Sequence, residues 1–450
     1  MIAMALALQL AIALAVAAGF ACHRGASLLH PLAFYLAFHL LVFVLRPALV
    51  HFAGFDGQWQ FMGFTPTPAG FVETLAVASL GLICFAAASL LAGGADAAGK
   101  PQPLHLTPPQ RRGMWLVAAA LLPVALLGAH LDLGLFAQPI AADGPLQRDA
   151  ASGYTLFVGT TAYLVKAHNL LGPLAALVLV AGRFRWWAWL PLLAFLAFRF
   201  YLGSRWGVAI VGGMALLLYL HATGRRWPPL RALAAALPLL LLFHAVGQDR
   251  TVLRELFAAE PVRHVRSVAA PAGPLDALDR PDFANFDFLA YIVDRVPERS
   301  GTYTYFTQYL ALFTHPIPRV LWPDKPVGSP IKLVELNDYG RFTGRTWSLP
   351  GDGWLSLGWA GVAVTLAGVG ALLGRLHALY RRHADRLLPA VAYCAFLPVT
   401  ILWFRGGTIT SVGRIGMWML LPVLLWWAVS AMLAALARRR TPARPLPPGG

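Results

Sequence analysis

Residues 415–440 read IGMWMLLPVLLWWAVSAMLAALARRR, an apolar run that ends in three consecutive arginines. The part 415–436 contains no ionisable residue. About 20 apolar residues in a helix are enough to cross a bilayer. An apolar run closed by a basic cluster is typical of a membrane span whose C-terminal end lies in the cytoplasm. This stretch therefore predicts a transmembrane helix with a cytoplasmic tail.

Comparable apolar runs recur along the 450-residue chain, which is 58% hydrophobic and only 12% charged. These values are typical of membrane proteins and lie outside the usual range of soluble domains. The sequence predicts an all-α polytopic integral membrane protein with about 11 transmembrane helices, within a range of about 10–12. The expected spans are 2–21, 29–53, 70–93, 113–131, 156–182, 187–203, 206–222, 231–247, 354–374, 388–404 and 415–436.

Basic residues gather in alternate loops, which sets the orientation of the spans. By the positive-inside rule these basic loops are cytoplasmic. The N-terminus and the long segment 248–353 then lie outside, and the C-terminus lies inside. We expect an N-terminal bundle of about eight spans in 1–247, a large outer loop in 248–353, about three further spans in 354–436, and a basic cytoplasmic tail in 437–450.

The outer loop has its own pattern. Residues 285–296 place apolar side chains at helical spacing, which predicts an amphipathic helix lying in the membrane surface. Residues 251–268 are weakly helical, and 269–282 resemble a linker. The prolines between 315 and 352 exclude a long helix or a central strand there. The same stretch is basic, so we expect the loop to fold over the spans as a lid.

Ionisable residues inside spans are costly and suggest function. The predicted topology places one set near the outer leaflet. Clustered guanidinium and ammonium groups neutralise a diphosphate without a metal, so we expect an anionic lipid-linked ligand. Snorkelling, an internal pair such as Arg46 with Glu73, and ordinary anionic headgroups are the alternatives. The set is Arg46, Glu73, Lys166, Arg199, Arg205, Arg405 and Arg414.

Three residues could act as a general base. Asp352 lies in Pro350-Gly351-Asp352-Gly353, predicted to be a flexible turn where the loop re-enters the membrane. His315 opens the proline-rich stretch, and Asp287 interrupts the amphipathic face. A turn role for Asp352 and a capping or packing role for the other two are the alternatives. The chain contains no HExxH, GxSxG or DxD and no aligned Cys/His ligands, so we expect no metal and no cofactor.

The run Pro316-Ile317-Pro318-Arg319-Val320-Leu321-Trp322-Pro323-Asp324-Lys325-Pro326 resembles the PR-x-LWP-x-KP segment of Wzy-type repeat-unit polymerases of bacterial O-antigen and exopolysaccharide. Residues 346–361, TWSLPGDGWLSLGWAG, are similar to the region of that family where the chain returns to the membrane. Gly203-Ser204-Arg205 is similar to its GSR turn. Asp352 stands where the family pattern has Glu, Trp354 where it has Tyr, and its Asn is absent.

The resemblance implies a GT-C-like, O-antigen ligase-like architecture in the bacterial inner membrane, with a periplasmic outer loop and N-terminus. It implies a metal-independent glycosyltransferase that joins undecaprenyl-diphosphate-linked oligosaccharide repeats at the periplasmic face. Expected partners are that substrate, membrane lipid, and a chain-length regulator and a flippase, with no nucleic acid.

Asp352 and His315 are the expected catalytic residues. An O-antigen ligase and a transporter or flippase of lipid-linked sugars remain the alternatives. The expected substrate-binding residues are Arg199, Arg205, Arg319, Lys325, Arg341, Arg345, Arg405 and Arg414.

Overall fold

The computed structural model of this chain describes residues 1–93, 106–136, 146–148, 155–157, 161–248, 279, 283–314, 317, 321–322, 348–406 and 409–440. Within these ranges nine helices are long and apolar enough to cross a membrane. The fold is therefore that of a polytopic membrane protein, as predicted. The nine candidate spans are Ile2–Cys22, Pro31–Ala53, Pro68–Ala92, Pro108–Gly134, Tyr163–Ala181, Arg205–Thr223, Leu349–Arg382, Leu387–Gly406 and Ile415–Ala437.

Two predicted spans fall outside this set. The segment 187–203 is divided between the short turn η3 (Trp186–Trp189) and α9 (Leu190–Tyr201). With 12 residues, α9 is shorter than the nine candidate spans, and the four residues of η3 lengthen it at its N-terminal end. The segment 231–247 does form a helix, α11 (Leu230–Gln248). The start of the ninth predicted span moves from 354 to Leu349, where α15 begins.

The remaining elements divide or connect these spans. β1 and β2 pair antiparallel, with Leu146 opposite Phe157, and they are the strands found in the described ranges. The helices and strands are α1 (Ile2–Cys22), α2 (Pro31–His39), η1 (Leu40–Leu45), α3 (Arg46–Ala53), α4 (Gly57–Met62), α5 (Pro68–Ala92), α6 (Pro108–Phe136), β1 (Leu146–Arg148), β2 (Thr155–Phe157), α7 (Thr161–Lys166), η2 (Ala167–Leu170), α8 (Leu171–Ala181), α10 (Arg205–Thr223), α13 (Asn285–Arg295), η5 (Thr307–Leu310), α14 (Ala311–Thr314), α15 (Leu349–Arg382), α16 (Leu387–Phe396), η7 (Leu397–Val399), α17 (Thr400–Gly406) and α18 (Ile409–Arg440).

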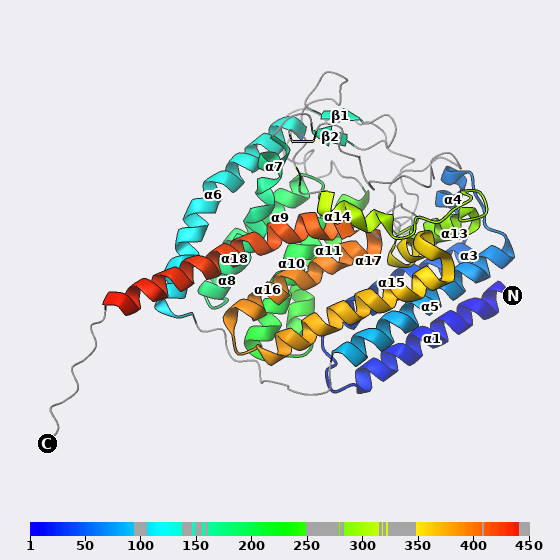
Figure 1. Cartoon of the computed structure of the whole chain (residues 1–450), viewed down its shortest axis with the longest axis horizontal. Coiled ribbons are helices and arrows are strands. Elements are labelled where there is room, and N and C mark those ends of the chain that lie inside the picture. Colours follow the sequence, from blue (N-terminus) through cyan, green and yellow to red (C-terminus); the bar gives the residue numbers. More distant parts are fainter. Residues whose placement is uncertain are drawn as a thin grey trace.

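α5 and α15 lie side by side along most of their lengths (Figure 1). Gly370 and Gly374 form a GxxxG pattern on α15, and a Cβ on Gly370 would lie 2.6 Å from the carbonyl oxygen of Phe85. Gly374 meets the backbone of Ser89 in the same way. Because both partner positions advance by four residues, the two helices run parallel. Small residues allow this close backbone approach, which is how membrane helices pack without a hydrophobic driving force.

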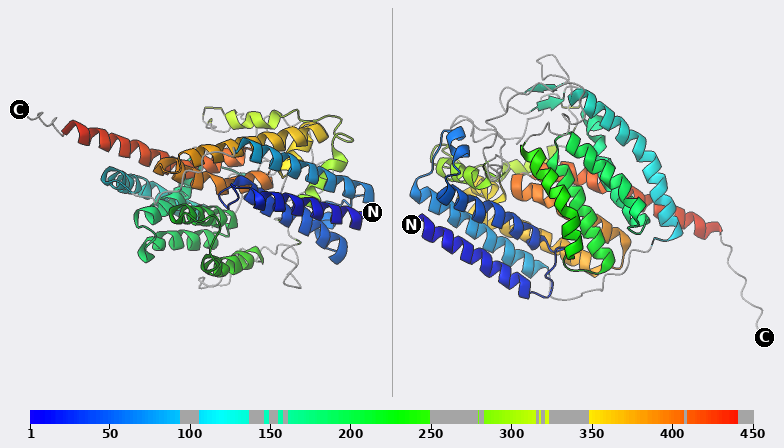
Figure 2. Two further views of the ribbon diagram at one scale, coloured as in Figure 1. Left: turned by 90° about the horizontal axis from the view of Figure 1, so that it is seen from below. Right: turned by 180° about the vertical axis from the view of Figure 1, so that it is seen from behind.

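The buried side chains form two clusters. One contains residues of α1 to α5, α13 and the first half of α15, and the other contains residues of α6, α8, α16 and α18. α10 contributes to both clusters and so joins them. Figure 2 shows α1, α5 and α15 grouped on one side of the molecule and α6 on the other. The expected site residues lie on helices of both clusters.

α13 corrects one prediction. The expected surface helix 285–296 is present, but it is buried on all sides: Phe286, Leu289 and Ile292 are each 0% exposed. Phe288 and Tyr291, which would face water on a surface helix, are also buried. The helix packs against α5 and α15, so protein and not lipid covers its apolar face. The predicted helix 251–268 lies outside the described residues, as does the linker 269–282 except for Asp279.

The second span changes its hydrogen bonding before Arg46. Pro47 has no N–H group, so the carbonyl of Phe43 loses its usual helical partner. η1 is a π-helical stretch at this place, and the N–H of Arg46 donates to the carbonyl of Leu41. The side-chain amide of Gln9 on α1 lies 3.5 Å from the Phe43 carbonyl oxygen. Arg46 therefore directly follows a π-helical stretch. Such stretches are frequent at functional sites.

We expect Gly370→Ala to destabilise the protein, because the added methyl group would overlap the Phe85 carbonyl of α5. The cost of such overpacking is about 1–3 kcal/mol. Gly368→Ala on the same helix is the matched control, since a Cβ there meets nothing within 4 Å. It should leave stability unchanged or raise it by up to about 1 kcal/mol through helix propensity. Thermal unfolding of the detergent-purified proteins measures both; equal melting temperatures would contradict the packing described for α5 and α15.

Candidate functional site

The first two turns of α15, residues 349–356, fold back on the rest of that helix. Leu357 and Gly358 have non-helical backbone angles, and Gly358 has a φ of 56°. A Cβ on Gly353 would lie 2.7 Å from the Cα of Val362, although nine residues of continuous helix span about 13 Å. Asp352 thus lies in a buried helical segment. The prediction of a flexible turn at 350–353 was wrong, because α13 packs over this segment and orders it.

Asp352 is 2% exposed and has a defined polar neighbourhood. The amide nitrogen of Gln308, on η5, donates to Oδ1 of Asp352 at 3.1 Å. The same nitrogen lies 2.7 Å from the hydroxyl of Ser356, which donates to the backbone carbonyl of Asp352. Oδ2 of Asp352 is buried and accepts no hydrogen bond of standard geometry from any described residue. A buried acceptor in that state is costly, so this oxygen suits a ligand donor.

Tyr309 lies next to Gln308 and is coupled to the carboxylate. Burial, and after it the negative charge of Asp352, raises the pKa of the Tyr309 phenol. The phenol therefore keeps its proton at neutral pH and presents a donor to the region of Asp352. Together, Gln308 and Tyr309 make η5 the polar wall of this small site.

A network of backbone contacts connects the Asp352 segment to Arg405. Ser348, which caps the start of α15, donates its N–H to the carbonyl oxygen of Arg405 at 2.8 Å. The side-chain amide of Asn285, at the start of α13, donates to the same oxygen at 2.7 Å. The Arg405 guanidinium lies 4.8 Å from the ring centre of Trp206, a cation–π distance. The end of α17 thus joins α13, α15 and α10.

Arg199, on α9, lies beside the first turn of α10. Its guanidinium contacts the ring of His168 and the hydroxyl of Ser204, and a Cβ on Gly207 would lie 2.5 Å from its Nε. His168 is in turn 3.7 Å from a carboxylate oxygen of Asp132. Asp132 also pairs with Lys166 at 3.1 Å, so Lys166 has an acidic partner. Arg205, next to Trp206, is 8% exposed.

Arg46 is held by the outer loop and does not pair with Glu73, which is exposed. Its guanidinium donates to both carboxylate oxygens of Asp287, at 2.9 and 3.0 Å, and to Asp279 at 2.8 Å. Arg46 is 1% and Asp287 0% exposed. Burial raises the pKa of the Asp287 carboxyl, and the charge of Arg46 opposes this effect. Asp287 is therefore a structural anchor for α13, and its expected role as a possible base is replaced by an ion pair.

The structure brings together part of the predicted site. Asp352, Arg405 and the Arg205–Trp206 pair belong to one contact network, and Arg199 borders it through Gly207. The sequence did not predict three residues of this site: Gln308, Tyr309 and Trp206. The polar residue Ser356, four positions after Asp352 and so on the same face of a helix, was the clearest sign in the sequence that Asp352 has polar neighbours. The side chain of Arg414 on α18 lies outside the described part, as do residues His315, Arg319, Lys325, Arg341 and Arg345. No protein-family model, curated protein or solved structure matches the chain.

We expect Asp287→Asn to destabilise the protein by up to about 3–5 kcal/mol, because it removes the buried carboxylate that accepts two hydrogen bonds from Arg46. Asp294→Asn on the same helix is the control: Asp294 is 35% exposed and its pair with Arg295 contributes about 1 kcal/mol or less. Unfolding of purified protein in mixed detergent micelles measures both. Arg46→Met combined with Asp287→Leu should recover much of the loss. Equal stability of the two single variants would show that the ion pair does not hold α13.

Proposed function

We propose that this chain is a glycosyltransferase that polymerises oligosaccharide repeat units carried on a polyprenyl diphosphate. In this reaction a hydroxyl oxygen of one lipid-linked repeat attacks the anomeric carbon of the sugar at the reducing end of another. The new glycosidic C–O bond forms as the bond from that carbon to the diphosphate breaks. The hydroxyl proton passes to a base, and the electron pair of the broken bond leaves with the lipid diphosphate.

The observation that carries this proposal is the buried carboxylate of Asp352, whose Oδ2 accepts no hydrogen bond of standard geometry from the described residues. A base for a sugar hydroxyl needs one accessible lone pair at hydrogen-bond distance. Oδ1 is already held by Gln308, which fixes the direction of the carboxylate. The phenol of Tyr309 also interacts with this carboxylate, and a sugar hydroxyl that replaced this contact would pass its proton to Oδ2. Fixed geometry of this kind favours catalysis because less orientation is lost on reaching the transition state.

The neighbouring cations support the same reaction. A departing diphosphate is a good leaving group when positive groups receive its charge, and no general acid is then needed. Arg405 is held on Trp206 and through its carbonyl on α15, so its position is tied to that of the Asp352 segment. Arg205 is the first residue of α10, and the Arg199 guanidinium contacts Gly207 in the same turn of that helix. The loop cations Arg319, Lys325, Arg341 and Arg345, together with Arg414 on α18, complete the set expected from the sequence.

The proposal includes an orientation in the bacterial inner membrane. The candidate site lies at the N-terminal end of α15, and α5 runs parallel to α15, so both start at the same face. The arginine-rich ends of α8, α10, α15 and α18 are the cytoplasmic ends in this proposal. The Asp352 end, the N-terminus and the outer loop are then periplasmic, where lipid-linked repeats are presented. The GT-C-like architecture suggested by the resemblance belongs to this proposal as well.

We expect Asp352→Asn to lower polymerisation by at least about 100-fold, since a general base typically contributes 10²–10⁴. Asp352→Glu should retain measurable activity, because Glu keeps the carboxylate and stands at this place in the family pattern. Asp385→Asn, an exposed position on the same chain, is the control. The assay follows the length distribution of the polysaccharide on a gel, with protein levels measured in parallel. Full-length polymer from a well-expressed Asp352→Asn variant would remove Asp352 from the mechanism.

We expect cells that lack the chain to accumulate single repeat units where the wild type shows a ladder of long chains. Complementation with Arg319→Ala or Arg345→Ala should shorten or abolish the ladder, because each removes a cation expected at the diphosphate. The exposed Arg382→Ala is the matched control and should restore the wild-type ladder. Long polymer that stays on its carrier lipid in the deletion strain would instead indicate a ligase. An unchanged ladder in that strain would refute polymerisation by this chain.

A further inference from the structure

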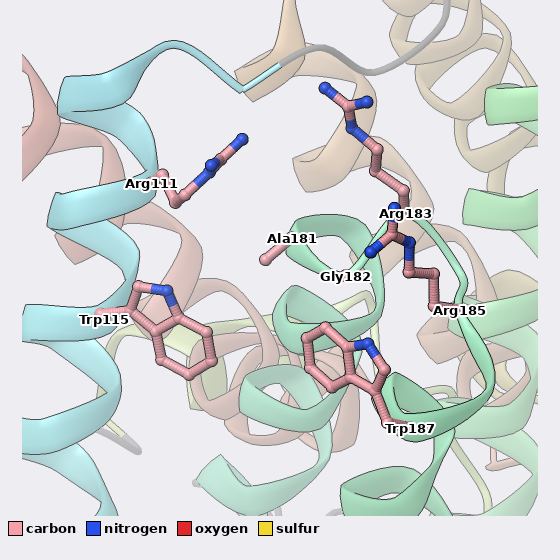
Figure 3. Close-up of a pocket in the computed structure, with 7 residues that line it drawn as sticks. All are labelled: Arg111, Trp115, Ala181, Gly182, Arg183, Arg185 and Trp187. Atoms are coloured by element: carbon pink, nitrogen blue, oxygen red, sulfur yellow. The ribbon is translucent and has the colours of Figure 1, made fainter.

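A basic pocket lies between α6 and the turn that follows α8 (Figure 3). Its volume is about 440 Å³. Figure 3 shows Arg111 and Trp115 reaching in from α6, and Arg185 and Trp187 facing them from the turn and from η3. The lining residues are Arg111, Trp115, Ala181, Gly182, Arg183, Arg185 and Trp187.

This pocket is at the end of the bundle opposite Asp352. α18 connects the two places: Gly413, near its start, contacts Leu312 of α14, and Ser430, further along, contacts Gly113 of α6. A helix rises about 1.5 Å per residue, so these two contacts lie about 26 Å apart along α18. Arg111 is two residues before Gly113. The pocket is therefore a separate feature from the candidate active site.

Backbone N–H groups cap the C-terminal end of α8, so the arginine side chains of the following turn are not needed for this role. The N–H groups of Gly182, Arg183 and Phe184 donate to the carbonyls of Val178, Val180 and Leu179, which satisfies the end of α8. Arg183 and Phe184 both have positive φ, 53° and 56°, a conformation that non-glycine residues rarely adopt. Such a conformation persists only where the surroundings hold it, and it is concentrated at binding sites.

Three arginines give this pocket a positive charge. No ion pair joins Arg111, Arg183 or Arg185 to a carboxylate within the parts of the chain that the structure covers. Three guanidinium groups around one cavity therefore suit a ligand with at least one phosphate, which arginine binds through two parallel hydrogen bonds.

Two tryptophans add an apolar surface to this pocket. Trp115 is 47% and Trp187 38% exposed, and tryptophans collect where a bilayer meets water. α6 and α9, which frame the pocket, continue with exposed side chains such as Leu116, Leu122 and Leu190. A phosphate bound by the arginines would therefore have room for acyl chains against these helices. Free inorganic phosphate would use the arginines alone.

We propose that this pocket binds the headgroup phosphate of an anionic phospholipid at the basic face of the membrane bundle. The arginines hold the phosphate oxygens, and the two tryptophans with the exposed leucines contact the glycerol and acyl chains. Basic pockets between transmembrane helices bind anionic headgroups by this combination of charge and depth.

Native mass spectrometry of the full chain, purified in detergent, tests this proposal. Dioleoyl phosphatidylglycerol should be retained at least about tenfold more strongly than dioleoyl phosphatidylcholine, because the quaternary ammonium of the choline headgroup would lie beside the three arginines and be repelled by them. The triple variant Arg111→Gln, Arg183→Asn and Arg185→Gln should lose this preference. Asparagine is chosen at 183 because it tolerates positive φ. The control Arg225→Gln, Arg226→Gln and Arg386→Gln removes three exposed arginines elsewhere and should keep the preference.

Single substitutions Arg111→Gln and Arg185→Gln should each weaken phosphatidylglycerol retention several-fold, so the test does not depend on folding of the triple variant alone. Equal retention of both lipids by the wild type would overturn the proposal. Undiminished retention by a folded triple variant, or an equal loss in the control, would also overturn it. Inorganic phosphate that displaces the lipid at equal concentration would show an anion site without lipid specificity and would overturn the assignment to a phospholipid.

Discussion

The buried ion pair between Arg46 and Asp287 is the constraint on which the arrangement of the outer loop depends. A guanidinium that is 1% exposed inside a membrane span requires a partner, since an isolated buried charge costs several kcal/mol. The partner comes from α13, and Asp279 supplies a third hydrogen bond from the loop. This pair fixes α13 to the start of α3, and α13, which also packs against α5, then provides the surface on which the first turns of α15 pack.

From α13 the chain reaches the candidate base through a series of direct contacts. The indole N–H of Trp354 donates to the carbonyl of Val296, and the N–H of Thr304 donates to the carbonyl of Leu355. Four residues after Thr304, Gln308 reaches Oδ1 of Asp352. These contacts hold the segment of α15 that precedes the fold-back at Gly358. The position of Asp352 is therefore determined by tertiary contacts of a loop, while the helix that carries it belongs to the membrane bundle.

The sequence predicted the spans well and these contacts poorly, for a physical reason. Hydropathy is a local property, and most expected spans agree with the helices to within a few residues. The partner of Arg46 is 241 positions away, whereas Glu73, the partner considered from sequence, is simply in the next span. The helical spacing of apolar residues in 285–296 is the same whether lipid or protein covers them, so the burial of α13 was not visible. Glycines at 351 and 353 suggested a turn, but they serve close packing.

The arginines at the two ends of the bundle differ in how they are held. Near Asp352, Arg199 contacts His168, and Arg405 lies on the ring of Trp206, so their guanidinium groups occupy fixed positions before any ligand arrives. Preorganised charge stabilises a developing anion with little reorganisation, which is what a leaving diphosphate requires. At the other end, Arg111, Arg183 and Arg185 line a cavity and have no ion pair with a carboxylate in the described structure. In the two proposals, the first set of arginines would receive a leaving diphosphate, and the second would hold a resident anion.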